Sequence, residues 1–200
     1  MDDFYRTISQ PTREEIKVKS SRFIAETKMV ENSNEAVSAW QQIRKREHAA
    51  THHCYAYRIG LEAEPEFKYS DDGEPNGTAG KPIYDCIVGR KLTNVLVGVT
   101  RYYGGTKLGT GGLVRAYSDA AIKALEISGI RTVYLTNQLS IEIEFKYYDQ
   151  LQKLIEKYKA KQDSSEFKEK VQLTLSVRKS KSDQLKNEII NLTHGQAKFE

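Results

Sequence analysis

Apolar residues recur at every second position in several short segments of the first two thirds of the chain, which is typical of half-buried β-strands. The alternation predicts strands over 14–19 and 23–29. A segment rich in aromatic and β-branched residues predicts a strand over 53–59 with a short partner over 67–69, and an apolar run predicts a buried strand over 94–102. Apolar residues at helical spacing predict helices from the capping-box sequence Asn32–Glu35 to about Glu47, over 83–88 and over 113–128, where Gly129 suits the helix end. We therefore expect a β-rich first domain with its helices on one side of the sheet.

From about Val133 the chain becomes rich in lysine and glutamate and poor in glycine, and the periodicity changes with the composition. The pattern here predicts strands over 139–145, 161–167, 171–177 and 196–199. Helices are predicted over 148–158 and after a capping position at Ser182 or Asp183. The resulting order, βαββαβ, is that of a ferredoxin-like split βαβ unit. The whole pattern predicts an α+β protein of two domains, residues 1–133 and 134–200.

Composition and charge narrow the class of protein. No apolar run approaches the roughly 18 residues needed to cross a bilayer, and the N-terminal sequence lacks the apolar stretch of a signal peptide. We therefore expect a cytoplasmic protein without membrane contact, in which Cys54 and Cys86 are reduced and buried. The net charge of +4 over 200 residues allows contact with a polyanion without requiring it.

The most unusual segment is RYYGGTKLGTGGLVRAY at 101–117, which follows a predicted strand and leads into a predicted helix. Glycine lets the backbone approach a ligand closely, and a helix beginning near Gly111 directs free N–H groups and partial positive charge outward. The segment contains neither nucleotide-binding glycine pattern, and a tight strand-to-helix turn is the simpler interpretation. The candidate residues for anion or nucleic-acid binding are Arg101, Tyr102, Tyr103, Gly104, Gly105, Lys107, Gly109, Gly111, Gly112 and Arg115.

A second dense segment, YSDDGEPNGTAGKP at 69–82, crowds three carboxylates into one turn. Such carboxylates can share a proton or hold Mg²⁺, but the spacing of a calcium-binding loop is not met and we predict no metal site. His48, His52, His53 and Cys54 are close to one another in sequence, but on a strand only His52 and Cys54 share a face, which is too weak a set for zinc. No catalytic residue or cofactor is assigned. The candidate residues of this second loop are Asp71, Asp72, Gly73, Glu74 and Lys81.

With these motifs in view, the chain resembles the IMPACT/YigZ family. The family signature R-[FYW]-[FYW]-G-G-x-x-[LIVM]-G is met without departure at Arg101–Gly109. Three upstream stretches also match: SRFIA at Ser21–Ala25, A-x-H-x-C-x-A at Ala50–Ala56 and DDGEPNGTAGKP at Asp71–Pro82. The matching blocks occur in the family's order and cover about two thirds of the chain.

The resemblance implies the folds of both domains and a role in translation. It implies an N-terminal domain like the second domain of ribosomal protein S5, followed by a ferredoxin-like domain similar to the last domain of the translocation factor EF-G. Eukaryotic members regulate translation by competing for the ribosome-associated activator of a starvation-sensing kinase. This sequence begins directly at the family domain, without the RWD domain of those members, so we do not transfer their partner.

Two functional hypotheses remain. In the first, the protein is a non-enzymatic regulator that binds RNA, the ribosome or a protein of translation, with Arg101, Lys107 and Arg115 contacting phosphates. At most one of Tyr102 and Tyr103 then faces the ligand, since neighbouring residues of a strand point to opposite sides. In the second, the protein binds or transforms a small phosphorylated ligand with Mg²⁺ held by the acidic loop.

Overall fold

The computed structural model describes residues 3–61 and 65–199, which divide into two units: Tyr5–Val133 and the remaining described residues. Each unit combines a β-sheet with helices and has a hydrophobic core of its own. The protein is therefore α+β with two domains, as the alternating periodicities predict.

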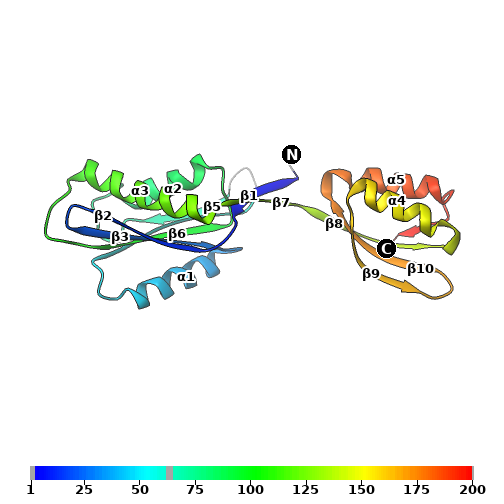
Figure 1. Ribbon diagram of the computed structural model, residues 1–200, viewed down its shortest axis with the longest axis horizontal. Helices are drawn as coiled ribbons and strands as arrows, with labels where there is room; N and C mark the ends of the chain where they lie inside the picture. The colour runs from blue at the N-terminus through cyan, green and yellow to red at the C-terminus, as the bar shows by residue number, and fades with distance from the viewer. Residues whose placement is uncertain (1–2, 62–64, 200) are drawn as a thin grey trace. The chain divides into compact units, whose positions relative to one another are not determined.

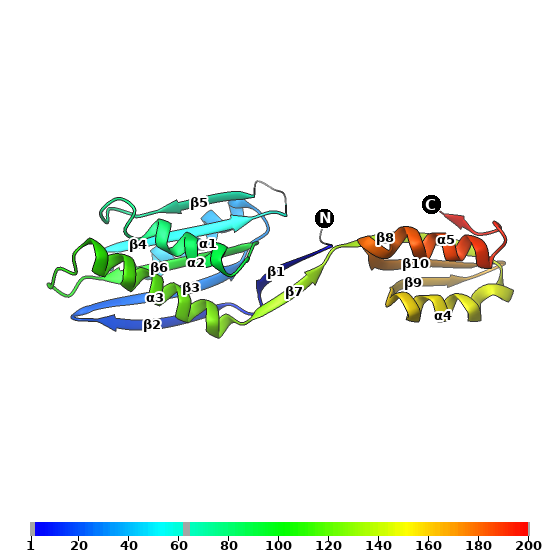
Figure 2. The same cartoon turned by 90° about the horizontal axis from the view of Figure 1, so that it is seen from above.

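The sheet of the first domain has five strands in the order β2-β3-β6-β4-β5, and all four neighbouring pairs are antiparallel (Figure 2). At its centre, Val99 of β6 lies opposite Ala25 of β3 and Cys54 of β4. The strands are β2 (Thr12–Val18), β3 (Ser21–Met29), β4 (His52–Ile59), β5 (Glu66–Ser70) and β6 (Val95–Tyr102).

Helices cover both faces of this sheet. Figure 1 shows α2 (Gly80–Gly89) and α3 (Thr110–Ser128) on one face and α1 (Ser33–Arg46) on the other. The expectation of helices on one side only is therefore wrong. The physical reason lies in β4 and β6, whose consecutive residues are apolar: Cys54 packs toward α2 and α3, whereas Tyr55 packs with Trp40 of α1. Such runs without alternation are typical of strands that are buried on both faces.

Two further strands, β1 (Phe4–Ile8) and β7 (Ile130–Tyr134), pair with each other in a separate two-stranded ladder. The sequence patterns did not predict them. Of β7 only Val133 is even partly buried, so this strand shows little hydrophobic periodicity. The long helix α3 ends as predicted, with Gly129 at φ 64° in the left-handed region that glycine tolerates best.

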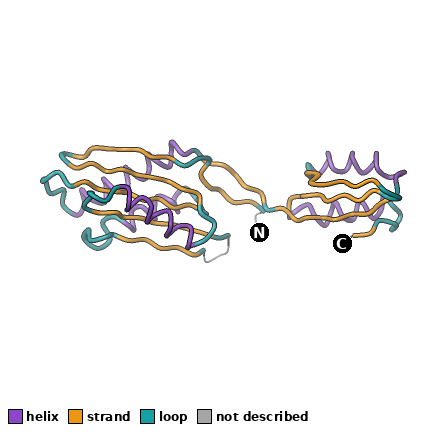
Figure 3. Tube along the Cα trace, turned by 90° about the horizontal axis from the view of Figure 1, so that it is seen from below, coloured by secondary structure: helices purple, strands orange, loops and turns teal. Residues whose placement is uncertain are grey.

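In the second domain the elements follow the predicted order βαββαβ, and the sheet order is β11-β8-β10-β9. Alternate residues of β10, from Val171 to Val177, pack against Leu151 of α4 and Leu185 of α5 in one core, and both helices lie on the same face of the sheet (Figures 1 and 3). The elements are β8 (Thr136–Ile143), η1 (Phe145–Tyr147), α4 (Tyr148–Tyr158), β9 (Lys161–Phe167), β10 (Val171–Arg178), η2 (Lys179–Lys181), α5 (Ser182–Leu192) and β11 (Lys198–Phe199).

Candidate functional site

The two motif segments, separated by about twenty residues in sequence, meet at one cavity of the first domain. Its volume is about 270 Å³. We call it the motif cavity; its lining residues are Glu74, Pro75, Arg101, Tyr103, Lys107, Leu108, Gly109, Thr110 and Leu113. The fold thus brings the acidic loop next to the glycine-rich loop, which the sequence analysis left separate.

A buried ion pair joins the two segments. Arg101, near the end of β6, is 5% exposed, and its Nη1 donates to Glu74 Oε1 at 2.6 Å. The hydroxyl of Tyr117, from α3, donates to the same oxygen at 2.8 Å. The guanidinium carbon also lies over two aromatic rings, 5.5 Å from the centroid of Phe23 and 5.2 Å from that of Tyr103. Arg101 is therefore held by the protein rather than projecting freely toward solvent.

The start of α3 supplies a second positive element. Gly109, with φ 74°, precedes the helix, and none of the described side chains caps this end. The first N–H groups of a helix lack intrahelical partners and carry partial positive charge, so anions are favoured there. Lys107 is exposed beside this end and lines the cavity. The mouth of the cavity is therefore electropositive.

Close approach of the backbone requires glycine at one position of the loop. A Cβ on Gly104 would lie 1.9 Å from the carbonyl oxygen of Ser20, far inside contact distance. The backbone N–H of Gly104 is directed to Ser21 Oγ at 3.3 Å. The glycine-rich loop is therefore tied against the turn between β2 and β3, so part of the glycine density is structural, as the simpler interpretation held.

The three carboxylates of the acidic loop are used separately. Asp71 accepts from the backbone N–H groups of Gly77, Ala79 and Gly80, at 2.8–2.9 Å, and so caps the start of α2. Asp72 Oδ2 accepts from His53 N at 2.6 Å. Because Glu74 pairs with Arg101, each carboxylate has its own protein donors. Among the described residues no three histidine, cysteine or acidic side chains are grouped to hold a metal ion.

The remaining predicted residues lie in several places. The hydroxyl of Tyr102 donates to Glu47 Oε2 at 2.9 Å, whereas Tyr103 is 43% exposed and lines the cavity. Arg115 is exposed on α3 and does not line the motif cavity. Lys81 pairs with Asp85 within α2 and lines a different cavity. Gly73 lies against His52, and Gly105, Gly111 and Gly112 belong to the loop and the first turn of α3.

Sequence reasoning missed several neighbours of the site. Tyr117 is one of the apolar positions whose spacing predicts the helix over 113–128, yet its hydroxyl reaches Glu74. A tyrosine rather than a phenylalanine at a core position is the signal that could have found this contact. His52 lies with Nε2 3.9 Å from Glu74 Oε1. Burial raises the pKa of both Tyr117 and the Cys54 thiol, so both groups are neutral near pH 7. A thiol in that state is a poor nucleophile.

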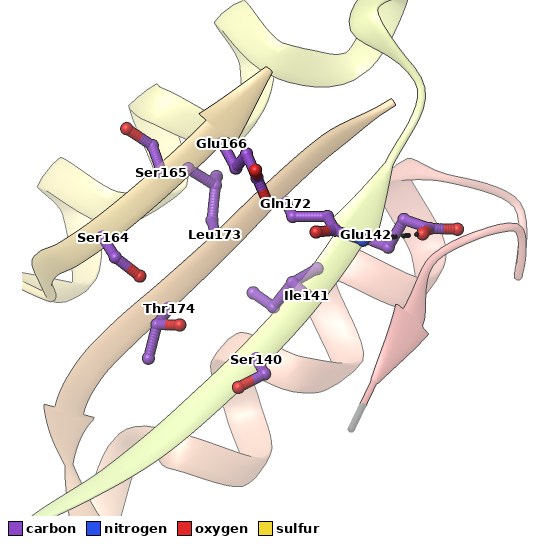
Figure 4. A pocket seen from close by; sticks show the side chains of 9 residues that line it. All are labelled: Ser140, Ile141, Glu142, Ser164, Ser165, Glu166, Gln172, Leu173 and Thr174. Carbon is purple, nitrogen blue, oxygen red and sulfur yellow. Dashed lines mark hydrogen bonds between the residues drawn. The ribbon is translucent and has the colours of Figure 1, made fainter. Parts of the chain in front are cut away.

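The second domain has a cavity of similar size, about 280 Å³, on its sheet (Figure 4). Short hydroxyl side chains form one row across three strands, since Thr174 pairs with Ser140 on one side and Ser164 on the other. Glu142, at the edge of this cavity, is bonded to Lys170 and Gln172. Glu166, the other carboxylate that lines this cavity, pairs with Lys168. Both carboxylates are thus already partnered, and neither motif segment contributes to this cavity.

Comparison with known proteins identifies the relatives of the chain. Residues 19–125 match the Impact N-terminal domain, and residues 141–196 match a domain of unknown function, DUF1949. The chain belongs to the IMPACT family. An IMPACT family member of Haemophilus influenzae is 32% identical over 90% of this chain and 88% of its own length, and the member YigZ of Escherichia coli is 30% identical over the same shares. The member YvyE of Bacillus subtilis is 42% identical over 63% of this chain and 58% of its own.

Solved structures place this IMPACT family protein beside another chain of the same architecture. A crystal structure of a hypothetical protein has a TM-score of 0.70 at 26% identity and covers 100% of this chain and 97% of that one. A structure described as the two-domain translational regulator Yih1 reaches a TM-score of only 0.37 at 22% identity, over 62% of this chain and 47% of that one. No helix in the described part of the chain is long and apolar enough to span a bilayer.

Proposed function

We propose that this IMPACT family protein is a non-enzymatic regulator of translation that binds RNA of the translation machinery at the mouth of the motif cavity. The observation that carries the proposal is the uncapped N-terminus of α3 beside the exposed side chain of Lys107. Phosphate groups are the usual ligands of such a helix end, and lysine adds a mobile positive charge.

The carboxylates of the acidic loop do not repel phosphate from this site. Glu74 is 8% exposed and paired with Arg101, and Asp71 is surrounded by three N–H donors. Both negative charges are therefore compensated within the protein. Arg115 is exposed further along α3 and adds a second positive charge on the same helix, which suits a polyanion that is longer than one phosphate.

Co-sedimentation with ribosomes at low and moderate salt tests the proposal. Association should weaken as salt rises, and the double variant Lys107→Glu/Arg115→Glu should lose it, because phosphate contacts release fewer counterions when cations are removed. The matched control is Lys68→Glu/Lys91→Glu, which reverses two exposed charges of the same domain that do not line the cavity. Equal loss in both variants, or no loss in the first, would exclude the motif cavity as the contact.

A second function is favoured by the presence of a cavity at the site. A cavity at a helix N-terminus can hold a small phosphorylated ligand as well as a polymer. The engaged state of Asp71, Asp72 and Glu74 weighs against the Mg²⁺ that such an enzyme would use. A thermal-shift screen of nucleotides and sugar phosphates, with and without Mg²⁺, separates the two functions, since a ligand of the native state raises its melting temperature.

The proposal also covers the fold class of each domain, because both classes occur in proteins of translation. We assign residues 1–133 to the ribosomal protein S5 domain 2-like class and residues 134–200 to the ferredoxin-like class. The strand order β11-β8-β10-β9 with both helices on one face supports the second assignment. Because translation takes place in the cytoplasm, the proposed function implies that the protein acts there.

A further inference from the structure

The motif cavity combines apolar walls with two buried polar side chains. Pro75, Leu108 and Leu113 line it together with the ring of Tyr103. Glu74 and Arg101, which are 8% and 5% exposed, line it as well. A phosphate group alone would match the electropositive mouth but not these walls. The occupant must bring an apolar face and a hydrogen-bonding edge.

Both buried polar groups retain unused hydrogen-bonding capacity. Glu74 Oε1 accepts from Arg101 and Tyr117, but Oε2 accepts a hydrogen bond from none of the described residues. Arg101 Nε has no acceptor within the described ranges either, but it is buried out of reach of solvent, so a ligand in the cavity cannot bond to it. The free acceptor is the carboxylate oxygen of Glu74, which lines the cavity, and it matches an edge that carries a hydrogen-bond donor.

The exposed side chains fit the rest of such a ligand. The centroid of the Tyr103 ring lies 5.2 Å from the Arg101 guanidinium carbon, and Tyr103 is 43% exposed, so part of its side chain is open to contact with another planar group. Lys107 and the N-terminus of α3 lie at the same cavity and attract an anion next to that group. A planar ring with a hydrogen-bonding edge and an adjacent phosphate is a nucleotide unit.

We propose that the motif cavity receives one unstacked base of a single-stranded RNA. Tyr103 stacks on the base, Glu74 Oε2 accepts a hydrogen from its edge, and Lys107 with the start of α3 holds a neighbouring phosphate. This inference rests on the proposed function and specifies the RNA feature that the site recognises. Unpaired bases are recognised in this way by stacking and edge contacts. A base in a duplex has no free face and is not accepted.

Abasic RNA separates recognition of the base from recognition of the backbone. Fluorescence anisotropy would measure the affinity of the full chain for an octaribonucleotide backbone without bases and for four derivatives, each with a single adenine, guanine, cytosine or uracil. Stacking and edge contacts should make at least one derivative bind about tenfold more tightly than the bare backbone. Tyr103→Ala should abolish this gain, whereas Tyr103→Phe, which keeps the ring, should retain it.

A matched control and the backbone affinity make the result decisive. Tyr69→Ala removes an aromatic side chain that is 40% exposed outside the cavity and should leave the gain intact. The inference is overturned if none of the four bases improves affinity, or if Tyr103→Ala and Tyr69→Ala retain the gain equally. If Tyr103→Ala loses ribosome association without any base-dependent gain, a protein side chain occupies the cavity and the inference is likewise wrong. The proposed function fails separately, if Lys107→Glu/Arg115→Glu leaves binding to the bare backbone unchanged.

Discussion

The buried pair Arg101–Glu74 should make the first domain depend strongly on either partner. Arg101 and Glu74 are 5% and 8% exposed, and Nη1 of the arginine lies 2.6 Å from Oε1 of the glutamate. Arg101→Met removes the positive charge at similar length and leaves Glu74 buried without its main partner. Removal of one member of a buried ion pair costs about 3–5 kcal/mol. For a domain of this size the melting temperature should fall by roughly 10–20 °C.

The companion change Glu74→Gln tests whether the charge is responsible. Glutamine keeps an oxygen for the Tyr117 hydroxyl but leaves Arg101 unpaired, so this single variant should also be destabilised by about 3 kcal/mol. In the double variant neither charge is present, and the loss should be smaller than the sum of the single losses by about 2–3 kcal/mol. A neutral amide beside a thioether leaves no uncompensated charge in the core.

Urea unfolding gives the measurement, because the chain has a single tryptophan, Trp40, which lies in the first domain. Its fluorescence reports this domain and is blind to tryptophan-free residues 134–200. The four free energies of unfolding form a double-mutant cycle. Strictly additive losses would refute the reasoning, since they would show that the two side chains do not stabilise each other.

Three further outcomes are expected. Gly104→Ala should lower the free energy of unfolding by about 3 kcal/mol because its Cβ meets Ser20 O. Gly111→Ala, where a Cβ meets nothing within 4 Å, should raise it by about 0.5–1 kcal/mol. Urea unfolding distinguishes the two variants, and equal effects would contradict the loop geometry. Burial raises the pKa of Cys54, so a disulfide reagent at pH 8 should modify this thiol far more slowly in the native than in the unfolded chain, as a timed mass measurement would show. Burial lowers the pKa of His53, so this imidazole binds a proton more readily in the unfolded chain than in the native one. The free energy of unfolding should therefore fall as pH drops below about 6.5. In urea unfolding between pH 8 and pH 5, His53→Gln should show a smaller fall than the unchanged protein.

The sequence patterns predicted the strands and helices whose signals are local. The alternation in β3 and the helical spacing of α3 follow from burial of one face, so they can be recognised in any short window. The covering of both sheet faces could not be recognised in the same way. It depends on where α1 packs, and the apolar run in β6 fits a buried strand whichever face each helix takes.

The candidate site shows the same division between local and distant signals. The unusual backbone at Gly104 and Gly109 can be predicted from the sequence, because the glycine density of this segment is a local signal. The contact between Glu74 and Arg101 joins residues 27 positions apart and depends on the antiparallel sheet that places both loops at one end. Likewise, Asp71 caps α2 from outside the helix, and α2 accordingly begins at Gly80, earlier than the predicted 83.

The position of Arg101 near the end of β6 sets how the site can fluctuate. β6 is the central strand of its sheet, and seven of its eight residues are buried, so its amides should exchange hydrogen only when the whole domain opens. The glycine-rich residues that follow are exposed from Tyr103 to Lys107 and can open locally. A steep gradient of exchange rates should therefore fall within a few residues of Arg101. A ligand bound in the cavity should slow hydrogen exchange at the loop amides that follow Arg101. The amides of β6 should exchange as slowly as they do without the ligand.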